Sequence, residues 1–327
     1  MTHRSTRRSV CRSEHHLCLD LSIRPLRAED TDSIIAIYDG AMAVERAIGP
    51  VSRSQWEGFV GQPQNRNGED FRVALNGDQL IGHAESSLRE QGRGRVRYCK
   101  LVVAPAFRRQ GVASALMNCL LKIDQPDDNL SFQAVAASDW TAGIAFLATL
   151  GFSYLESDLS MRCVQLVPLP DSPSHRQSLE QIAAPASVAA DVTRIHNAAY
   201  RSDVAFRIFT PEEMAADMSG EDLWIARDSD QIVGFCRISL EPALVWIESL
   251  AVHPDYHGRG IGTALAYRAL RSVGGGSDRF AGLNVSSANS RTKAIYARLG
   301  FTSGREQRRF STLRNHLVAV MERRQLH

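Results

Sequence analysis

The segment VHPDYHGRGIGTAL, residues 252–265, decides the fold of this chain. An apolar run at 246–252 predicts a strand before it, and the residues from Ile261 onward predict a helix after it. A strand that passes through a glycine-bearing loop into a helix directs several backbone N–H groups at one point, where the helix dipole adds partial positive charge. The segment therefore predicts an anion site. It is not a P-loop, because no Lys-Ser/Thr pair follows the glycines, and the glycine spacing is not that of a Rossmann turn.

An internal repeat sets the number of domains. The pattern occurs earlier as VAPAFRRQGVASAL, residues 103–116, and a Leu-Gly-Phe turn follows each copy, at 150–152 and at 299–301. The two motifs lie 149 residues apart in both cases, which unrelated matches would not do, so two homologous halves are predicted. Three prolines within 167–173 predict a stiff connection. We expect four segments along the chain: a disordered leader at 1–20, a first domain at 21–166, a linker at 167–174 and a second domain at 175–327.

Each half alternates strands and helices in a similar order. Apolar residues at helical spacing predict a helix over 30–42, and Asn76-Gly77 predicts a hairpin turn between two strands. A comparable hairpin is expected around 228–230 in the second half. The fold class is therefore α/β, with a central mixed, mostly antiparallel sheet flanked by helices in each half.

Composition excludes several classes of protein. Of 327 residues, 44% are hydrophobic and 23% charged, and 38 basic residues nearly cancel 36 acidic ones. No apolar run approaches the ~20 residues of a membrane-spanning helix, and no basic and aromatic stripe indicates nucleic-acid binding. The six cysteines have no metal-ligand spacing and are expected to be reduced thiols. The leader lacks the apolar stretch of a secretory signal. We expect a cytoplasmic protein with no metal, no membrane and no nucleic-acid partner.

The loop pattern, with Asn289 and Tyr296 ahead of the second Leu-Gly-Phe, resembles the GCN5-related N-acetyltransferase (GNAT) superfamily over essentially residues 21–327. That family's loop, Gln/Arg-x-x-Gly-x-Gly/Ala, grips the pyrophosphate of acetyl-CoA. It occurs here as RRQGVA at 108–113 and as HGRGIG at 257–262, where His257 departs from the usual residue. The resemblance implies these coenzyme-binding residues: Val103, Arg108, Arg109, Gln110, Gly111, Val112 and Ala113 in the first half, and Leu250, Ala251, Val252, His257, Gly258, Arg259, Gly260, Ile261, Gly262, Thr263 and Asn289 in the second.

Glu248 is the candidate general base. Alternation along the predicted strand places Trp246, Glu248, Leu250 and Val252 on one face, and a carboxylate among apolar neighbours tends to have a raised pKa, which suits a base. Members of the family often place a glutamate here. The alternative is a strand residue that faces solvent near a sheet edge.

Tyr296 is the candidate general acid. By resemblance it protonates the departing sulfur of coenzyme A, and the alternative is an aromatic residue on the buried face of a helix. Asn289 matches a family position that holds the pantetheine arm or the following helix turn. By the same resemblance, backbone N–H groups near Leu250 and Val252 are expected to stabilise the oxyanion and to contact the pantetheine.

The offset of 149 residues indicates that the first half lacks this chemistry. It maps Glu248 to Cys99, Asn289 to Trp140 and Tyr296 to Leu147. The phosphate loop persists, so we expect the first half to keep an acetyl-CoA-like pocket without catalysis. A nucleophilic role for Cys99 is the alternative, although no histidine nearby in the sequence would activate it.

The residues and the resemblance together predict an N-acetyltransferase. It would transfer acetyl from acetyl-CoA to a primary amine of a small molecule, by direct attack in a ternary complex. The tandem layout with a degenerate first half is similar to the mycothiol synthases, which acetylate the amine of a cysteine-containing pseudo-disaccharide. The alternatives are a non-catalytic acyl-CoA-binding regulatory protein and a peptide N-terminal acetyltransferase. Glu248 and Tyr296 in a single half favour catalysis, since binding alone needs neither.

Overall fold

The computed structural model describes residues 19–45, 51–62, 65–66, 70–91, 94–123, 127–165, 178–183, 185–201, 208–241, 244–273 and 280–325. The predicted linker lies outside these ranges, as does the predicted leader except for its last two residues.

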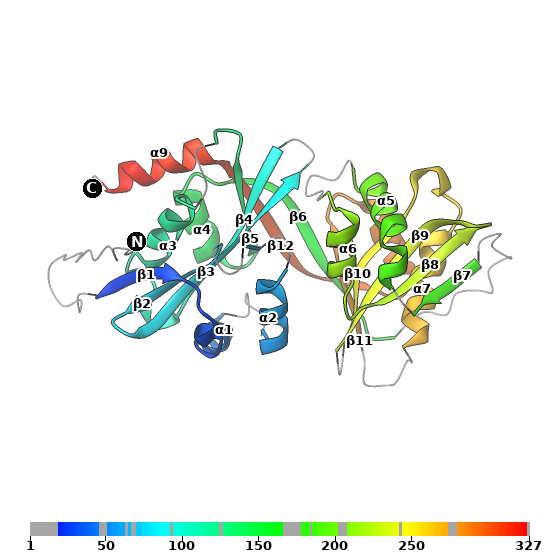
Figure 1. Cartoon of the computed structure of the whole chain (residues 1–327), viewed down its shortest axis with the longest axis horizontal. Helices are drawn as coiled ribbons and strands as arrows, with labels where there is room; N and C mark the ends of the chain where they lie inside the picture. The colour runs from blue at the N-terminus through cyan, green and yellow to red at the C-terminus, as the bar shows by residue number, and fades with distance from the viewer. Residues whose placement is uncertain are drawn as a thin grey trace. The chain divides into compact units, whose positions relative to one another are not determined.

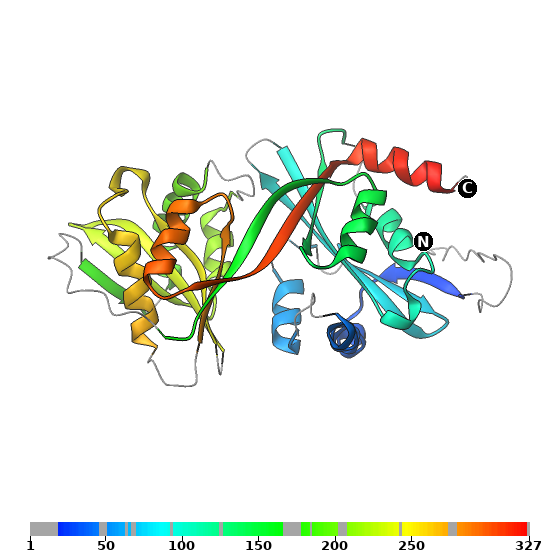
Figure 2. The same cartoon turned by 180° about the vertical axis from the view of Figure 1, so that it is seen from behind.

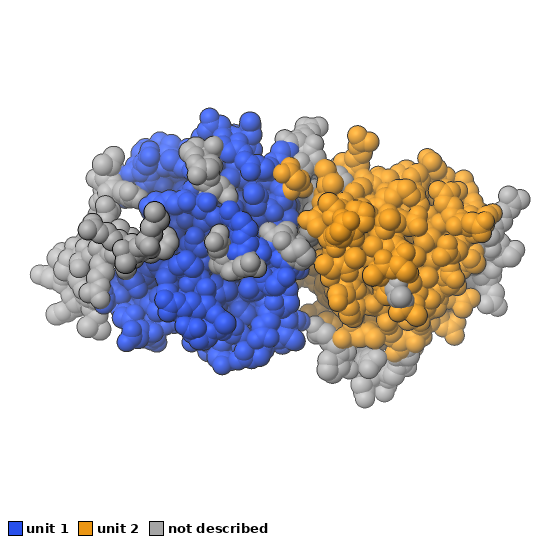
Figure 3. Space-filling view, viewed as in Figure 1, with its two compact units in different colours: residues 1–89, 94–154, 310–327 blue, residues 90–93, 155–309 orange. Residues whose placement is uncertain are grey.

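The chain forms two compact units (Figure 3), and each combines segments that are distant in sequence. Unit 1 consists of residues 1–89, 94–154 and 310–327, and unit 2 consists of residues 90–93 and 155–309. The predicted first domain, 21–166, therefore contributes its final residues to unit 2. The predicted second domain, 175–327, contributes its final residues to unit 1.

The last strand of each half accounts for this exchange. β6 (Ser153–Cys163) begins in unit 1 and continues in unit 2, where it pairs antiparallel with β11 (Phe280–Ser286). β12 (Thr302–Leu313) begins in unit 2, ends in unit 1, and is the neighbour of β5 (Ser131–Ala137) in the strand order. Figures 1 and 2 show these two strands as the green and red-brown ribbons. Each half of the sequence thus ends in a strand that completes the sheet of the other unit.

Unit 1 is a sheet with the strand order β1-β2-β3-β4-β5-β12, in which β4 and β5 run parallel. The predicted hairpin is confirmed, because Asn76 pairs with Gln79 and Gly77 has a φ of +58°. Besides β5 and β12, its elements are β1 (Leu21–Pro25), η1 (Ala28–Asp30), α1 (Thr31–Val44), α2 (Arg53–Val60), β2 (Arg72–Asn76), β3 (Gln79–Gln91), β4 (Gly94–Val103), η2 (Pro105–Phe107), α3 (Val112–Leu120), α4 (Thr141–Thr149) and α9 (Arg314–Gln325).

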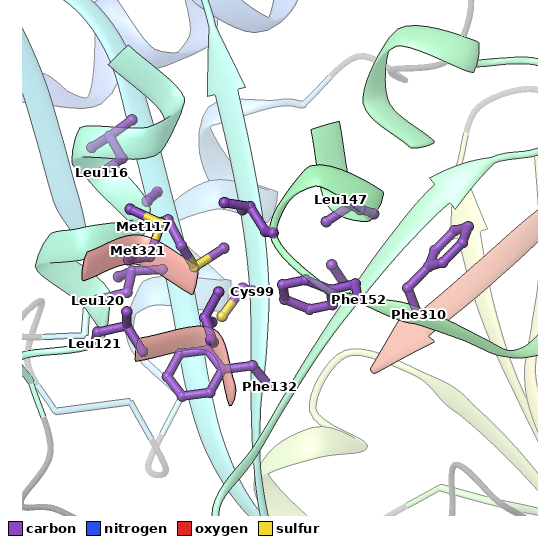
Figure 4. Packing of buried hydrophobic residues seen from close by; sticks show 14 of the residues in the cluster. Cys99, Leu116, Met117, Leu120, Leu121, Phe132, Leu147, Phe152, Phe310 and Met321 are labelled. Carbon is purple, nitrogen blue, oxygen red and sulfur yellow. The ribbon is translucent and has the colours of Figure 1, made fainter. Parts of the chain in front are cut away.

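Two apolar clusters cover the two faces of the unit 1 sheet. Val73 packs in the cluster formed with α1 and α2, whereas its neighbour Ala74 packs in the cluster formed with α3 and α4, as alternation along a strand requires. Phe310 and Met321, from the end of the chain, belong to this second cluster (Figure 4). The C-terminal helix α9 is therefore part of the core of unit 1.

Unit 2 has the strand order β7-β8-β9-β10-β11-β6-β12, and β10 runs parallel to β11. Helices α5 and α6 cover one face and α7 and α8 the other, as the two opposite views in Figures 1 and 2 show. A mixed sheet flanked by helices in each unit, together with the repeat in sequence, confirms the predicted fold class. The remaining elements are β7 (Ser178–Ile182), η3 (Pro185–Val188), α5 (Ala189–Ala199), α6 (Pro211–Asp217), β8 (Asp222–Asp228), β9 (Gln231–Glu241), β10 (Leu244–Val252), η4 (Pro254–Tyr256), α7 (Ile261–Ser272) and α8 (Ser290–Arg298).

Candidate active site

Strand β10 leads into the loop of unit 2 and contains a bulge at Glu248. Its register against β9 shifts between Ile247 and Ser249, so Glu248 has no partner opposite it. A bulge adds one residue and reverses the alternation beyond it. Ile247 accordingly packs in the apolar cluster with α7, and so does Leu250, three residues later. The predicted alternation is therefore wrong, and these residues do not share one face: Trp246, Glu248, Leu250 and Val252.

β10 and β11 separate at this bulge. Leu244–Ile247 pairs with Phe280–Leu283, and no pairing follows. Beyond that point β10 continues beside β9, and β11 continues beside β6. The wedge that opens from Glu248 onward exposes one edge of β10.

The backbone of Leu250 and Val252 faces this open edge. The N–H of His253 donates to the Val233 carbonyl on β9. In an antiparallel pair every second residue directs its N–H and C=O groups at the partner strand, so those of Leu250 and Val252 point away from β9. The Leu250 carbonyl accepts a hydrogen bond from the Tyr200 hydroxyl at 2.8 Å. The N–H groups of Leu250 and Val252 are thus placed at the wedge, where the oxyanion donors were predicted.

The loop after β10 is shaped by two left-handed glycines and one histidine. Gly258 and Gly260 have φ values of +81° and +78°, and Gly260 is the N-cap of α7. The His257 side chain lies with Nε2 2.8 Å from the Val252 carbonyl oxygen. The Arg259 guanidinium donates to the Asp255 carbonyl at 3.0 Å. Both side chains therefore hold the loop's own backbone.

Unit 1 repeats this geometry with different residues. Arg108 Nε donates to the Val103 carbonyl at 3.0 Å, and Gln110 donates to the Ala106 carbonyl at 3.0 Å. Gly111, with a φ of +85°, caps α3, and Arg109 has a φ of 63° in the place of Gly258. A residue with a Cβ atom in this conformation is uncommon. The two loops therefore share a conformation although Gly258 is replaced by Arg109 and His257 by Arg108.

Each loop presents a row of backbone N–H groups. Among the described residues, no acceptor is found for the N–H groups of 258–263 in unit 2 or of 109–114 in unit 1. The first bonds of the following helices are donated by Ala264, to Gly260, and by Ala115, to Gly111. Because such groups at a helix N-terminus favour an anion, these residues fit the diphosphate of a nucleotide coenzyme.

Tyr296 lies in α8 and is buried, 4% exposed, against the cluster that includes Phe301. Burial, with smaller contributions from Cys236 and Tyr200, raises the pKa of Tyr296 well above its ordinary value. The phenol therefore stays protonated at neutral pH and can donate a proton. Its aromatic ring is also part of the core, so the two roles weighed from the sequence are compatible.

Asn289 is the N-cap of α8. Its side-chain carbonyl accepts a hydrogen bond from the N–H of Thr292 at 3.0 Å, so it holds the following helix turn, one of the two contacts predicted for it. Trp140, at the corresponding place in unit 1, makes no side-chain cap.

Glu248 is exposed, and the Ser239 hydroxyl donates to it at 2.6 Å. This carboxylate therefore lies outside the apolar setting that the predicted alternation implied. A second acidic group, Glu221, is close enough to Glu248 to interact with its charge. Glu221 accepts hydrogen bonds from the buried guanidinium of Arg237, and burial raises its pKa while Arg237 opposes that shift.

The counterparts in unit 1 are apolar or buried. Leu147 and Cys99 are each 6% exposed and lie in the same hydrophobic cluster. β4 and β5 nevertheless pair only over Val96–Cys99 and Ser131–Ala134, so a similar wedge opens there. Unit 1 keeps the backbone arrangement of the site and lacks the proposed catalytic side chains.

Two residues of this site were not predicted from the sequence. Ser239 lies opposite Trp246, just before the bulge, and counting the β9–β10 register from Glu241 opposite Leu244 leads to it. Tyr200 follows α5, and no pattern in the sequence predicted its hydrogen bond to β10. In the part of the chain that the structure describes, no helix is long and apolar enough to cross a membrane, and no group of side chains is arranged to hold a metal.

Comparison with known families identifies the family of this chain. The model of the acetyltransferase (GNAT) family matches residues 32–152 and again residues 189–301, so each half carries one copy. The chain therefore belongs to the acetyltransferase (GNAT) family and is an acyltransferase.

Relatives that match most of the chain carry more specific names. The chain is 29% identical over 258 residues to a mycothiol acetyltransferase of Mycolicibacterium vanbaalenii, which covers 74% of this chain and 81% of that protein. A mycothiol acetyltransferase of Propionibacterium freudenreichii is 26% identical, over 85% of this chain and 87% of its own. A tandem GNAT protein from the clavulanic acid biosynthesis pathway shares the fold, with a TM-score of 0.68 at 18% identity, over 90% of this chain and 98% of that one.

Proposed function

We propose that unit 2 transfers acetyl from acetyl-CoA to a primary amine of a small molecule, by direct attack within a ternary complex. The observation that carries the proposal is the combination of an open wedge beside β10 with a row of unbonded N–H groups at the α7 N-terminus. Family membership supports the reaction type.

The backbone would position the coenzyme. The N–H groups of 258–263 would hold its diphosphate, and the left-handed glycines allow the backbone to approach closely. The N–H groups of Leu250 and Val252 would contact the pantetheine and stabilise the oxyanion as the amine attacks. Acetyl-CoA, when bound, supplies the thioester that is attacked.

Two side chains would move protons. Glu248 would accept the proton of the attacking amine, directly or through a water molecule, because it lies where β10 leaves β11. Tyr296 would donate a proton to the departing sulfur, since its phenol is protonated at neutral pH. Cys236 contributes to the raised pKa of Tyr296, and burial raises the pKa of its own thiol to about 12. A thiol with this pKa is a poor source of thiolate nucleophile, which supports direct transfer.

Unit 1 would support the fold and keep a coenzyme-like loop without turnover. Its wedge and loop match those of unit 2, but Cys99 and Leu147 replace the base and the acid. A retained anion site at 109–114 is consistent with coenzyme binding there.

A small-molecule amine is the acceptor class that the relatives favour, since two of those named above are mycothiol acetyltransferases. The test is a screen of amines with detection of released thiol. The panel should contain the cysteinyl amine precursor of mycothiol, aminoglycosides, polyamines and short peptides with free N-termini. Turnover with a small amine is the expected result. Turnover with peptides alone would favour an N-terminal acetyltransferase, and coenzyme binding without any turnover would favour a regulatory binding protein.

A further inference from the structure

Arg291 lies beside the anion-binding loop of unit 2. It belongs to the first turn of α8, and its side chain is exposed. A Cβ atom built on Gly258 would lie 3.8 Å from a terminal nitrogen of Arg291, so the guanidinium reaches the loop at its first left-handed glycine. This places a full positive charge next to the N–H groups of 258–263.

Within the described part of the chain, no hydrogen bond or ion pair engages Arg291. The other arginine of this region is already used, because Arg259 donates to the Asp255 carbonyl and stacks on the Tyr256 ring at 4.6 Å. Arg291 is therefore a cation available to a ligand on the loop, whereas part of the Arg259 guanidinium is held by the loop itself.

Unit 1 has no arginine at the start of α4, although its loop has the exposed Arg109 in the place of Gly258. The repeat offset maps Arg291 to Ala142, at the start of α4. The nearest analogue in function, Arg108, forms an ion pair with Glu45 at 2.8 Å and bonds to the backbone of its own loop. The two anion sites thus have the same backbone geometry, with an exposed arginine from α8 beside the loop in unit 2 and one within the loop itself in unit 1.

We propose that Arg291 is a phosphate ligand that strengthens coenzyme binding in unit 2. This inference rests on the proposed function. A nucleotide coenzyme of this kind carries a diphosphate and a 3′-phosphate, and backbone N–H groups supply only partial charges to them. A guanidinium bonds a phosphate with two parallel donors and remains charged at every working pH.

The test is calorimetric titration of the whole chain with coenzyme A and, separately, with dephospho-coenzyme A. The variants are Arg291→Ala, Arg291→Lys and a control, Arg298→Ala, which removes an equal charge from the far end of the same helix. Arg291→Ala should weaken coenzyme A binding roughly ten- to hundredfold, the range of a hydrogen bond to a charged group. Arg291→Lys should recover part of this loss, and the control should bind like the wild type.

The second ligand identifies the phosphate. If Arg291→Ala weakens coenzyme A alone and removes the preference over dephospho-coenzyme A, the contact is to the 3′-phosphate. If both ligands weaken equally while Arg298→Ala has no effect, the contact is to the diphosphate. Unchanged affinity for both ligands, or an equal loss in the control, would overturn the role of Arg291. Failure of the wild type to bind either ligand would instead overturn the proposed function.

Discussion

The imidazole Nε2 of His257 lies 2.8 Å from the carbonyl oxygen of Val252. In unit 1, Arg108 makes the matching contact with the Val103 carbonyl at 3.0 Å. The imidazole in unit 2 and the guanidinium in unit 1 thus make the same contact, which holds the loop between the end of the strand and the N-terminus of the following helix. The departure of His257 from the family's usual Gln or Arg therefore preserves a donor to this carbonyl.

Replacing His257 tests whether this side chain acts on the loop. His257→Ala should weaken acetyl-CoA binding two- to tenfold, because a neutral hydrogen bond contributes about 0.5–1.5 kcal/mol. His257→Arg should bind nearly as well as the wild type, since Arg108 makes the same bond in unit 1. Dissociation constants from calorimetry provide the measurement. If the arginine variant lost as much affinity as the alanine variant, the imidazole would have a role other than holding the loop.

Tyr296→Phe should lower kcat about 10²- to 10⁴-fold and leave acetyl-CoA affinity unchanged, because it removes a proton donor and keeps the ring that packs on Phe301. A thiol-release assay measures kcat, and calorimetry on the same preparation measures the affinity for acetyl-CoA. A kcat equal to that of the wild type would remove Tyr296 from the mechanism and leave it a core residue. The variant should unfold at nearly the wild-type temperature, which checks that the fold is intact.

Glu248→Gln should lower kcat/KM by about 10²-fold or more and weaken the rise of the rate with increasing pH, since an amide accepts no proton. Ser239→Ala, which removes only the hydroxyl bonded to this carboxylate, should have a much smaller effect on the rate. The pH–rate profile of each variant is the measurement. An unaltered profile in Glu248→Gln would assign the base to another group.

His83 predicts an acid-sensitive step in the stability of unit 1. It is 1% exposed, and burial, with a contribution from Lys100, lowers its pKa to about 3. Between pH 6.5 and 3 the unfolded chain binds a proton that the folded chain does not. The free energy of unfolding therefore falls as the pH falls through this window, by up to about 1.4 kcal/mol per pH unit from this group.

His83→Phe should remove this contribution and keep the aromatic contacts with Tyr38 and Trp56. Glu85 and Lys100 face the same region and remain in both proteins, so the difference between the two denaturation series isolates the histidine. Urea denaturation between pH 4.5 and 6.5 should give a slope shallower by about one proton in the variant. Identical slopes would mean that His83 is protonated in the folded chain.

The sequence was sufficient for the features that depend on the backbone pattern. The repeat at a spacing of 149 residues predicted two related halves, and the glycine loops lie between a strand and a helix in both units. The hairpin predicted at Asn76-Gly77 has Gly77-Asp78 as its two-residue loop, in which Gly77 takes the left-handed φ of +58°.

The exchange of last strands could not be predicted in this way. The residues of β6 and β12 have the same alternation whichever sheet they complete, so local pattern does not select the partner strand. The bulge at Glu248 was missed for a related reason. Strict alternation assumes a continuous register, and the shift after Ile247 depends on pairing with β9.

Arg291 and Tyr200 carry no sequence signal either. Arginines on exposed helix faces are common, and what singles out Arg291 is its distance from Gly258, which only the fold determines.

The most direct test of the central claim compares turnover of two matched glycine variants, Gly260→Val and Gly111→Val. Both glycines are left-handed N-caps, with φ values of +78° and +85°, so the backbone strain introduced is similar. If the loop of unit 2 holds the coenzyme during catalysis, Gly260→Val should lose at least about 100-fold in kcat/KM for acetyl-CoA, whereas Gly111→Val should keep most of its activity. Equal losses in the two variants, or full activity in Gly260→Val, would contradict it.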